Sequence, residues 1–68
     1  MAAVIVYPPA EDGGRRVRVG EQFLGMAYGL LDVADFLRRA GFGEADEAYV
    51  RAYGGIEWRG GGPDVWVH

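Results

Sequence analysis

Five residue types are missing from this chain of 68 residues: cysteine, lysine, serine, threonine and asparagine. Without cysteine, neither a disulfide framework nor a thiolate zinc site can hold the fold together. Covalent catalysis normally uses Ser, Cys, Thr, Lys, His, Tyr or a carboxylate, and the first four do not occur here. Serine and cysteine triads, thiolate chemistry and lysine Schiff bases are therefore excluded.

Histidine and metal-ligand patterns are almost as scarce. The single histidine is His68, the last residue, in a region where chains are usually poorly ordered. Asp32 and Asp35 are spaced i, i+3, but two neighbouring arginines, Arg38 and Arg39, explain them as a solvated ion-pair face. No His-X-X-X-His pair or EF-hand pattern is present. We expect no catalytic residues, no metal and no cofactor. A small carboxylate-dependent enzyme or ligand binder is the weakest of the alternatives that stay open.

Long apolar runs are also absent. The apolar stretch Ala2–Val6 is too short for a signal-peptide core and has no basic leader. No segment approaches the roughly 20 apolar residues that span a bilayer. The sequence therefore predicts a cytoplasmic protein without a membrane contact.

The composition that remains is that of one small globular domain spanning 1–68. Half of the residues are apolar and 25% are charged, unlike a disordered chain. A chain this short buries only about 60% of the surface that its unfolded form exposes, so its stability is marginal. The aromatic residues must compensate, helped by a partner or a second copy.

The N-terminal half predicts a three-stranded meander. The β-branched run at Val4–Tyr7 stops at two prolines, and a loop rich in Pro, Gly and acids follows. Arg15–Val19 then alternates, with Val17 and Val19 on one face and Arg16 and Arg18 on the other. Gly20-Glu21 closes a two-residue turn into a third strand over 22–28.

The middle of the chain predicts helices. Residues 30–40 place a broad apolar arc opposite charged residues, with Gly41 ending the helix and Phe42 folding back on its last turn. Asp35 can pair with Arg39 one turn on. Residues 44–53 have an acidic first turn and favour a short second helix, although Ala48–Arg51 is also compatible with a strand.

The C-terminal part predicts two short strands, Ile56–Arg59 and Val65–Val67, joined by a glycine loop. Together these elements predict an α+β fold: an antiparallel or mixed sheet of four to five strands, one main helix over 30–40 and a short second helix over 44–53. The expected core lies between the helix and the first two strands: Leu30, Val33, Ala34, Phe36 and Leu37 against Val4, Val6, Val17 and Val19.

The leading functional hypothesis is a non-catalytic protein-interaction module, homodimeric or an accessory subunit. The loop Gly60-Gly61-Gly62 lies between two tryptophan-bearing segments, and close approach of a partner would explain its glycines. Tryptophan and arginine dominate binding hot spots, so the expected binding residues are Trp58, Arg59 and Trp66. That both tryptophans belong to the core remains an equal alternative.

The alternative function is nucleic-acid binding through a basic strand face formed by Arg15, Arg16 and Arg18, with Phe23 or Tyr28 available for stacking. The net charge of −3 opposes it, because a protein that displaces counterions usually has a larger basic footprint.

Two resemblances accompany these patterns. The motif Ile56-Glu57-Trp58-Arg59-Gly60-Gly61-Gly62-Pro63 followed by Val65-Trp66, together with Asp35–Gly41, is similar to short proteins of high-GC actinobacteria. The similarity covers about half of the chain and implies a bacterial cytoplasmic protein, but no activity. The strand–strand–helix–strand order also resembles a β-grasp domain. The chain ends in Trp66-Val67-His68 and lacks the terminal Gly-Gly of sulfur carriers, so that function is not implied.

Overall fold

A four-stranded sheet and two helices make up the fold in a computed structural model that describes residues 3–66. The predicted α+β class is confirmed, with one main helix and a short second helix. The elements follow in the order β1 (Val4–Val6), β2 (Arg15–Val19), β3 (Gln22–Ala27), α1 (Leu30–Arg39), α2 (Glu47–Ala52) and β4 (Ile56–Trp58).

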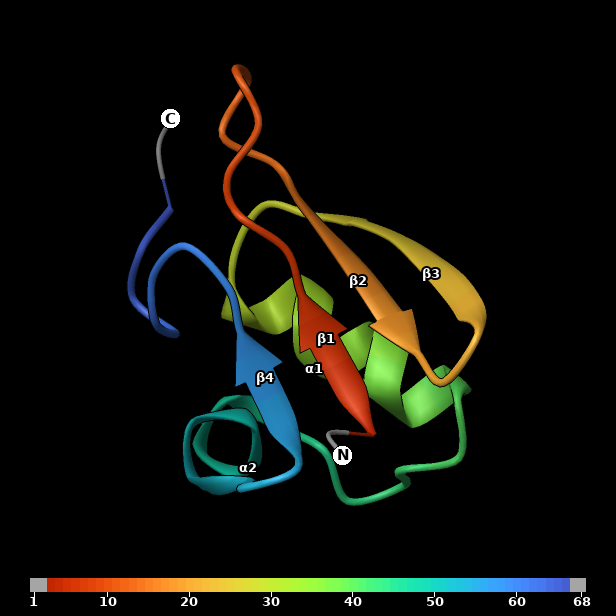
Figure 1. Ribbon diagram of the computed structural model, residues 1–68. Helices are drawn as coiled ribbons and strands as arrows, with labels where there is room; N and C mark the ends of the chain where they lie inside the picture. Colours follow the sequence, from red (N-terminus) through yellow and green to blue (C-terminus); the bar gives the residue numbers. More distant parts are fainter. Residues whose placement is uncertain (1–2, 67–68) are drawn as a thin grey trace.

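The sheet is mixed, with strand order β3-β2-β1-β4 (Figure 1). β1, β2 and β3 form the predicted antiparallel meander, and the Gly20-Glu21 turn brings Val19 opposite Gln22. The chain then crosses through both helices, and β4 returns parallel to β1, with Val6 opposite Trp58. This parallel pairing places the C-terminal segment beside the first strand.

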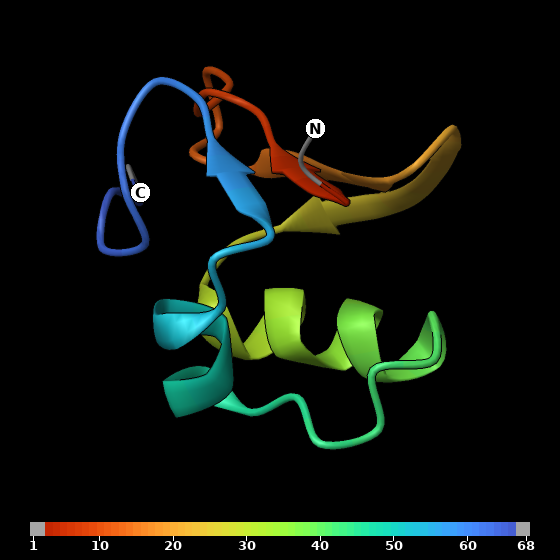
Figure 2. The same cartoon turned by 60° about the horizontal axis from the view of Figure 1, so that its bottom comes forward.

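The helices cover one face of the sheet and leave the other uncovered (Figure 2). The alternation in β1 and β2 points Val4, Val6 and Val17 into the core, where they are 0% exposed. Of the predicted core, Val19 and Phe36 are half-buried at the margin. Leu31, an apolar residue of the predicted helix 30–40, is 68% exposed. The other buried apolar residues are Ala27, Leu30, Val33, Ala34, Leu37, Ala45, Val50 and Ile56.

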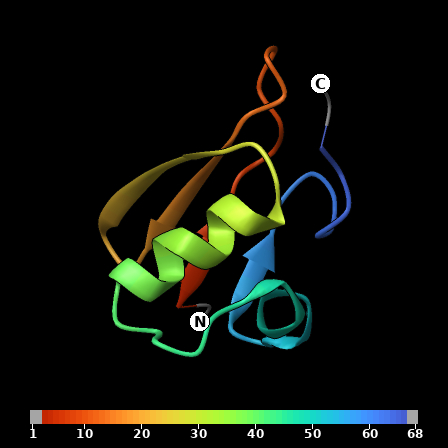
Figure 3. The same cartoon turned by 180° about the vertical axis from the view of Figure 1, so that it is seen from behind.

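Helix α1 runs across the back of the sheet (Figure 3) and ends as its sequence predicts. Gly41 has a φ of 106°, a left-handed conformation that glycine adopts readily. The Phe42 N–H donates to the Leu37 carbonyl at 2.9 Å and the Gly41 N–H to the Arg38 carbonyl at 3.2 Å, the bonding pattern of a Schellman ending. The predicted ion pair between Asp35 and Arg39 forms at 3.0 Å.

Helix α2 confirms the helical interpretation of 44–53 over Glu47–Ala52. Asp46 caps it by accepting a hydrogen bond from the Tyr49 N–H at 2.8 Å. Tyr49 stacks on Tyr53, whose ring meets Phe42 edge-on at 5.7 Å between centroids. The three rings are partly buried and pack against the core.

The second predicted C-terminal strand does not form in the described part of the chain. Val65 and Trp66 lie outside any strand, and Val67 lies outside the described residues. The Val65 N–H donates to the Gly62 carbonyl at 3.2 Å, which folds the segment back on itself. Between residues 3 and 66, neither helix has the length and apolar character to cross a membrane.

Candidate binding surface and the buried arginine beside it

Arg15, at the start of β2, is a fully buried charged residue, with 0% of its surface exposed. Its guanidinium uses all five of its N–H donors on main-chain carbonyls. Nε donates to Tyr7 at 2.8 Å, Nη1 to Gly62 at 2.8 Å and Val65 at 2.9 Å, and Nη2 to Arg59 at 3.0 Å and Gly61 at 2.7 Å. Four of the five acceptors come from the segment after β4, so Arg15 holds that segment against the sheet.

The two tryptophans complete the enclosure of Arg15. The guanidinium carbon lies 5.5 Å from the ring centroid of Trp58 and 5.3 Å from that of Trp66, within the range of cation–π attraction. Trp66 is fixed by its indole N–H, which donates to the Pro63 carbonyl at 2.7 Å. Both tryptophans are half-buried, and their rings serve this internal contact.

Carbonyl dipoles and aromatic faces compensate the buried charge, since no ion pair within residues 3–66 includes Arg15. Desolvation lowers the pKa of Arg15 from its ordinary value. An arginine nevertheless stays protonated in proteins, so the charge is retained. The set of Tyr7, Arg15, Trp58, Trp66 and the carbonyls of 59–65 is called the arginine clasp below.

Contacts within the chain account for two glycines of the loop. Gly60 and Gly61 have φ values of 77° and 134°, which L side chains rarely adopt. A Cβ on Gly60 would lie 2.6 Å from Cβ of Pro8, and one on Gly61 would lie 2.8 Å from Cβ of Val65. The loop needs glycine for both its conformation and its close packing, and its carbonyls thereby turn toward Arg15.

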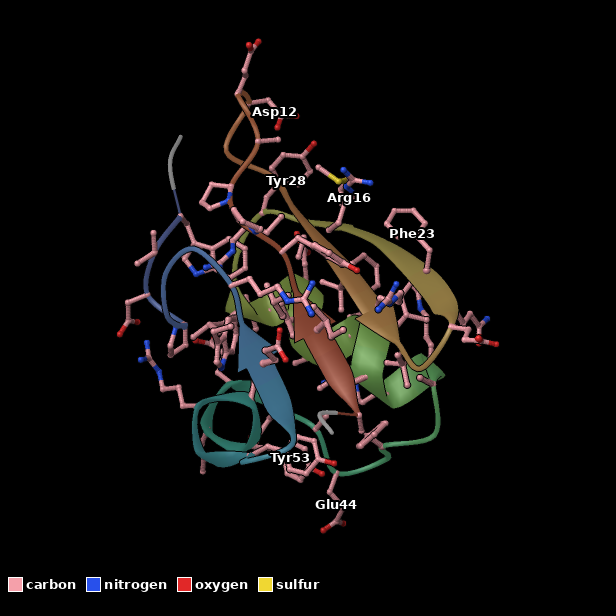
Figure 4. All side chains as sticks on the ribbon, in the orientation of Figure 1. Asp12, Arg16, Phe23, Tyr28, Glu44 and Tyr53 are labelled. Atoms are coloured by element: carbon pink, nitrogen blue, oxygen red, sulfur yellow. The ribbon has the colours of Figure 1, made fainter. Side chains whose placement is uncertain are left out.

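The uncovered sheet face carries two rows of side chains that cross the strands, and we call it the open face. Its residues alternate with the core residues of each strand, and the register aligns them. Figure 4 looks onto this face, with Arg16 between Tyr28 and Phe23. The first row consists of Arg59, Tyr7, Arg16 and Met26, and the second row consists of Glu57, Ile5, Arg18 and Phe23.

Tyr7 is the centre of the charged part of the open face. The guanidinium carbons of Arg16, Arg18 and Arg59 lie 5.8, 5.7 and 5.3 Å from its ring centroid. Arg59 also pairs with Glu57, which raises the pKa of Arg59. Nε of Arg18 is shielded from solvent and has no acceptor within residues 3–66.

The open face is positively charged, although the chain as a whole is negatively charged. Three arginines and one glutamate give the open face a formal charge of +2, whereas the whole chain carries −3. The face also has apolar character, because Phe23 is 56% exposed and both Ile5 and Met26 are half-buried. Basic and apolar groups therefore share one uncovered surface.

A second polar contact borders this surface. The Tyr28 hydroxyl donates to the Asp12 carboxylate at 2.8 Å, and the Gly14 N–H donates to it at 2.9 Å. These hydrogen bonds lower the pKa of Asp12, the Gly14 bond most strongly. The same carboxylate raises the pKa of Tyr28. The contact ties the 8–14 loop to the end of β3.

The structure places the predicted site residues in two different parts of the molecule, the clasp and the open face. Arg15 belongs to the core and its donors are occupied, so it cannot contribute to a nucleic-acid face. Arg16 and Arg18 lie on the open face as expected, and the parallel pairing of β4 adds Arg59 to them. Trp58 and Trp66 face the clasp instead.

Two features of the site were missed by sequence reasoning, although the alternation contains a signal for each. Arg15 lies two residues before Val17 and four before Val19, so the alternation of the strand puts it on the same inward face as these valines. Ile5 and Tyr7 alternate with the inward-facing Val4 and Val6, so the same rule puts them on the outward face.

Comparisons with known proteins add nothing to this geometry. No family model, curated protein or solved structure matches the chain. Within residues 3–66, no group of three or more His, Cys, Asp or Glu side chains is arranged to hold a metal ion.

Proposed function

We propose that this protein is a non-catalytic interaction module that binds an acidic segment of another protein on its open face. The observation that carries the proposal is the gathering of Arg16, Arg18 and Arg59 around Tyr7 on an uncovered sheet. Of the residues expected from the sequence, Arg59 keeps a binding role, and Trp58 and Trp66 act through the clasp.

Charge complementarity selects the occupant. A patch of +2 on a chain of −3 attracts an acidic segment and orients it toward this side of the molecule. The exposed side chain of Phe23, beside the arginines, adds apolar contact area to the charged surface. The face therefore suits a peptide that carries both acidic and apolar residues.

A second copy of the chain fits this face less well. A two-fold symmetric contact places the same surface patch of both subunits together. Two open faces would then oppose their arginines, and like charges across an interface are unfavourable. This argument favours the accessory-subunit form of the sequence-based hypothesis over a homodimer through the open face.

The test uses a labelled synthetic peptide of nine alternating glutamate and valine residues as the acidic probe, followed by fluorescence anisotropy. Arg16→Glu should weaken binding by at least about fivefold, because it replaces an attraction with a repulsion. Arg39→Glu is the matched control: it makes the same charge change on α1, at a side chain that is 73% exposed.

Equal weakening by both variants would show that only net charge matters and would contradict a defined binding face. Circular dichroism of both variants establishes that each is folded.

Single-stranded nucleic acid is a second candidate, favoured by one observation. Phe23 and Tyr28 are 56% and 44% exposed on either side of Arg16, an arrangement in which bases can stack between phosphate contacts (Figure 4). Oligothymidylate in the same assay distinguishes the two ligands. Binding of oligothymidylate that is tighter than that of the peptide, lost with Phe23→Ala and steeply weakened by salt, would favour the nucleic acid.

A further inference from the structure

The β3 edge of the sheet has no strand beside it in the described part of the chain. β3 and β4 are the outer strands of the order β3-β2-β1-β4, and β3 has six residues against three in β4. The outward main-chain groups of an edge strand are a template for pairing with another chain. The longer edge is therefore the stronger candidate for strand addition.

Few of the usual protections of an edge are present in β3. Natural edge strands are guarded by lysine, proline, inward-pointing charges or bulges. The strand Gln22–Ala27 contains no charged residue and no proline, and its one irregularity is a register shift opposite Val17 and Arg18. An extended segment can approach this edge without meeting a charge on β3 itself.

The two faces beside the edge differ in chemistry. On the open face, Met26 lies opposite Arg16 and Phe23 opposite Arg18. On the helix side, Leu24 and Phe36 pack against the core but remain half-buried. A strand added at the edge alternates its side chains between these two sides. Acidic side chains on the open-face side would lie beside Met26 and Phe23, one strand away from Arg16 and Arg18, and aliphatic side chains on the other side would cover Leu24 and Phe36.

We propose that the β3 edge receives an extended segment of the partner protein as a fifth strand, with acidic and apolar residues in alternation. The segment's main chain bonds to β3, and its acidic side chains lie toward Arg16 and Arg18. This inference rests on the proposed function and specifies how the acidic segment is held. It is strand addition, in which main-chain hydrogen bonds give affinity and alternate side chains give specificity.

The decisive experiment methylates the main-chain nitrogens of the Glu-Val peptide. In an extended strand, alternate N–H groups point to the same side, so only one set can bond to β3. One peptide carries N-methyl groups on three valines, and the other on three glutamates. Strand addition predicts that one peptide binds at least about tenfold more weakly than the unmodified probe, while the other keeps its affinity to within about threefold.

Amide hydrogen exchange gives an independent measurement. Binding should slow exchange in Gln22–Ala27 and leave that of β4 unchanged. An equal effect of both N-methylated peptides, without slowing in β3, would overturn strand addition while leaving the open face as the binding surface. Absence of any binding by the unmodified peptide at millimolar concentration would overturn the proposed function as well.

Light scattering on the protein alone measures whether two copies of the chain pair with each other in the absence of the peptide. A dimer whose exchange is already slowed in β3 would replace the acidic segment by a second copy as the occupant and would overturn the proposal. A monomer with rapid exchange in β3 supports a vacant edge that is filled by the peptide.

Discussion

Arg15 combines three properties that rarely occur together: full burial, a positive charge and no carboxylate partner among residues 3–66. Its planar fork of five donors matches the five carbonyls around it, and its flat faces match two indole rings. Lysine has three donors on a compact ammonium, so it cannot replace this geometry. The identity of a single residue therefore decides whether the C-terminal segment is held.

Replacing Arg15 with lysine should lower the free energy of unfolding by about 2–6 kcal/mol, because at least two buried carbonyls lose their donor at about 1–3 kcal/mol each. Arg15→Met should be more destabilising, since all five acceptors lose their partner. Urea unfolding followed by tryptophan fluorescence and by far-UV circular dichroism measures both variants. Wild-type stability of Arg15→Met would contradict a structural role for the clasp.

The Asp12 carboxylate makes the stability of the fold depend on pH. Its pKa is lowered in the folded state by hydrogen bonds from Gly14 and Tyr28, so its ionised form stabilises the fold. That contribution is present above the unfolded value of 3.8 and is lost as pH falls through the lower folded value. The difference in unfolding free energy between wild type and Asp12→Ala should be constant from about pH 7 to pH 5 and shrink below about pH 4.

Urea titrations at several pH values measure this difference. Asp12→Asn keeps an acceptor but cannot ionise, so wild type should lose stability relative to it as pH falls below about 4. A difference between wild type and Asp12→Ala that does not change down to pH 2 would contradict the assigned contacts.

At the scale of elements, local signals fixed the helices and the meander. The Gly41 ending and the Gly20-Glu21 turn depend on residues close in sequence, and both form as predicted. The acidic start predicted for the second helix begins three residues later than expected, with Asp46 as its cap. The segment after β4 behaves differently. Its alternation of Val65 and Trp66 indicates a strand, but its carbonyls bond to Arg15, which is about 50 residues earlier in the chain. A long-range contact thus overrides the local pattern.

The glycine loop offers a matched pair of substitutions. Gly61→Ala places a Cβ against Val65 at a φ of 134° and should cost about 1–3 kcal/mol. Gly62→Ala meets nothing within 4 Å and should be close to neutral. Thermal or urea unfolding of both variants provides the measurement, and equal effects of the two alanines would contradict close packing of Gly61 against Val65.

At the scale of the whole molecule, the clasp connects the two ends of the fold. Tyr7 follows β1, Arg15 begins β2, and the carbonyls of 59–65 follow β4. Tyr7 and Arg59 also supply side chains to the open face, so the clasp positions the backbone that carries the proposed binding surface. Two residues are therefore shared between the clasp and that surface.

Removing the residues after Trp58 deletes four of the five acceptors of Arg15 together with Trp66. The truncated chain should lose most of its stability, which for a domain of this size is at the lower end of about 5–15 kcal/mol. Combining the truncation with Arg15→Met should cost much less than the sum of the two separate effects, because both act on the same contact. Far-UV circular dichroism during urea unfolding measures all four chains, and strict additivity would contradict the coupling.

The sequence by itself determined the α+β class, the order of the four strands and two helices, the C-terminal end of α1 and the side on which the valines of β1 and β2 enter the core. These properties follow from periodicity and from turn and capping residues, which act over a few positions. Tertiary structure alone decided that β4 lies parallel to β1, that Trp58 and Trp66 enclose Arg15, and that Arg59 joins Arg16 and Arg18 around Tyr7. The physical reason is that burial and pairing across 40 or more residues depend on which surfaces meet, and no local pattern records that meeting.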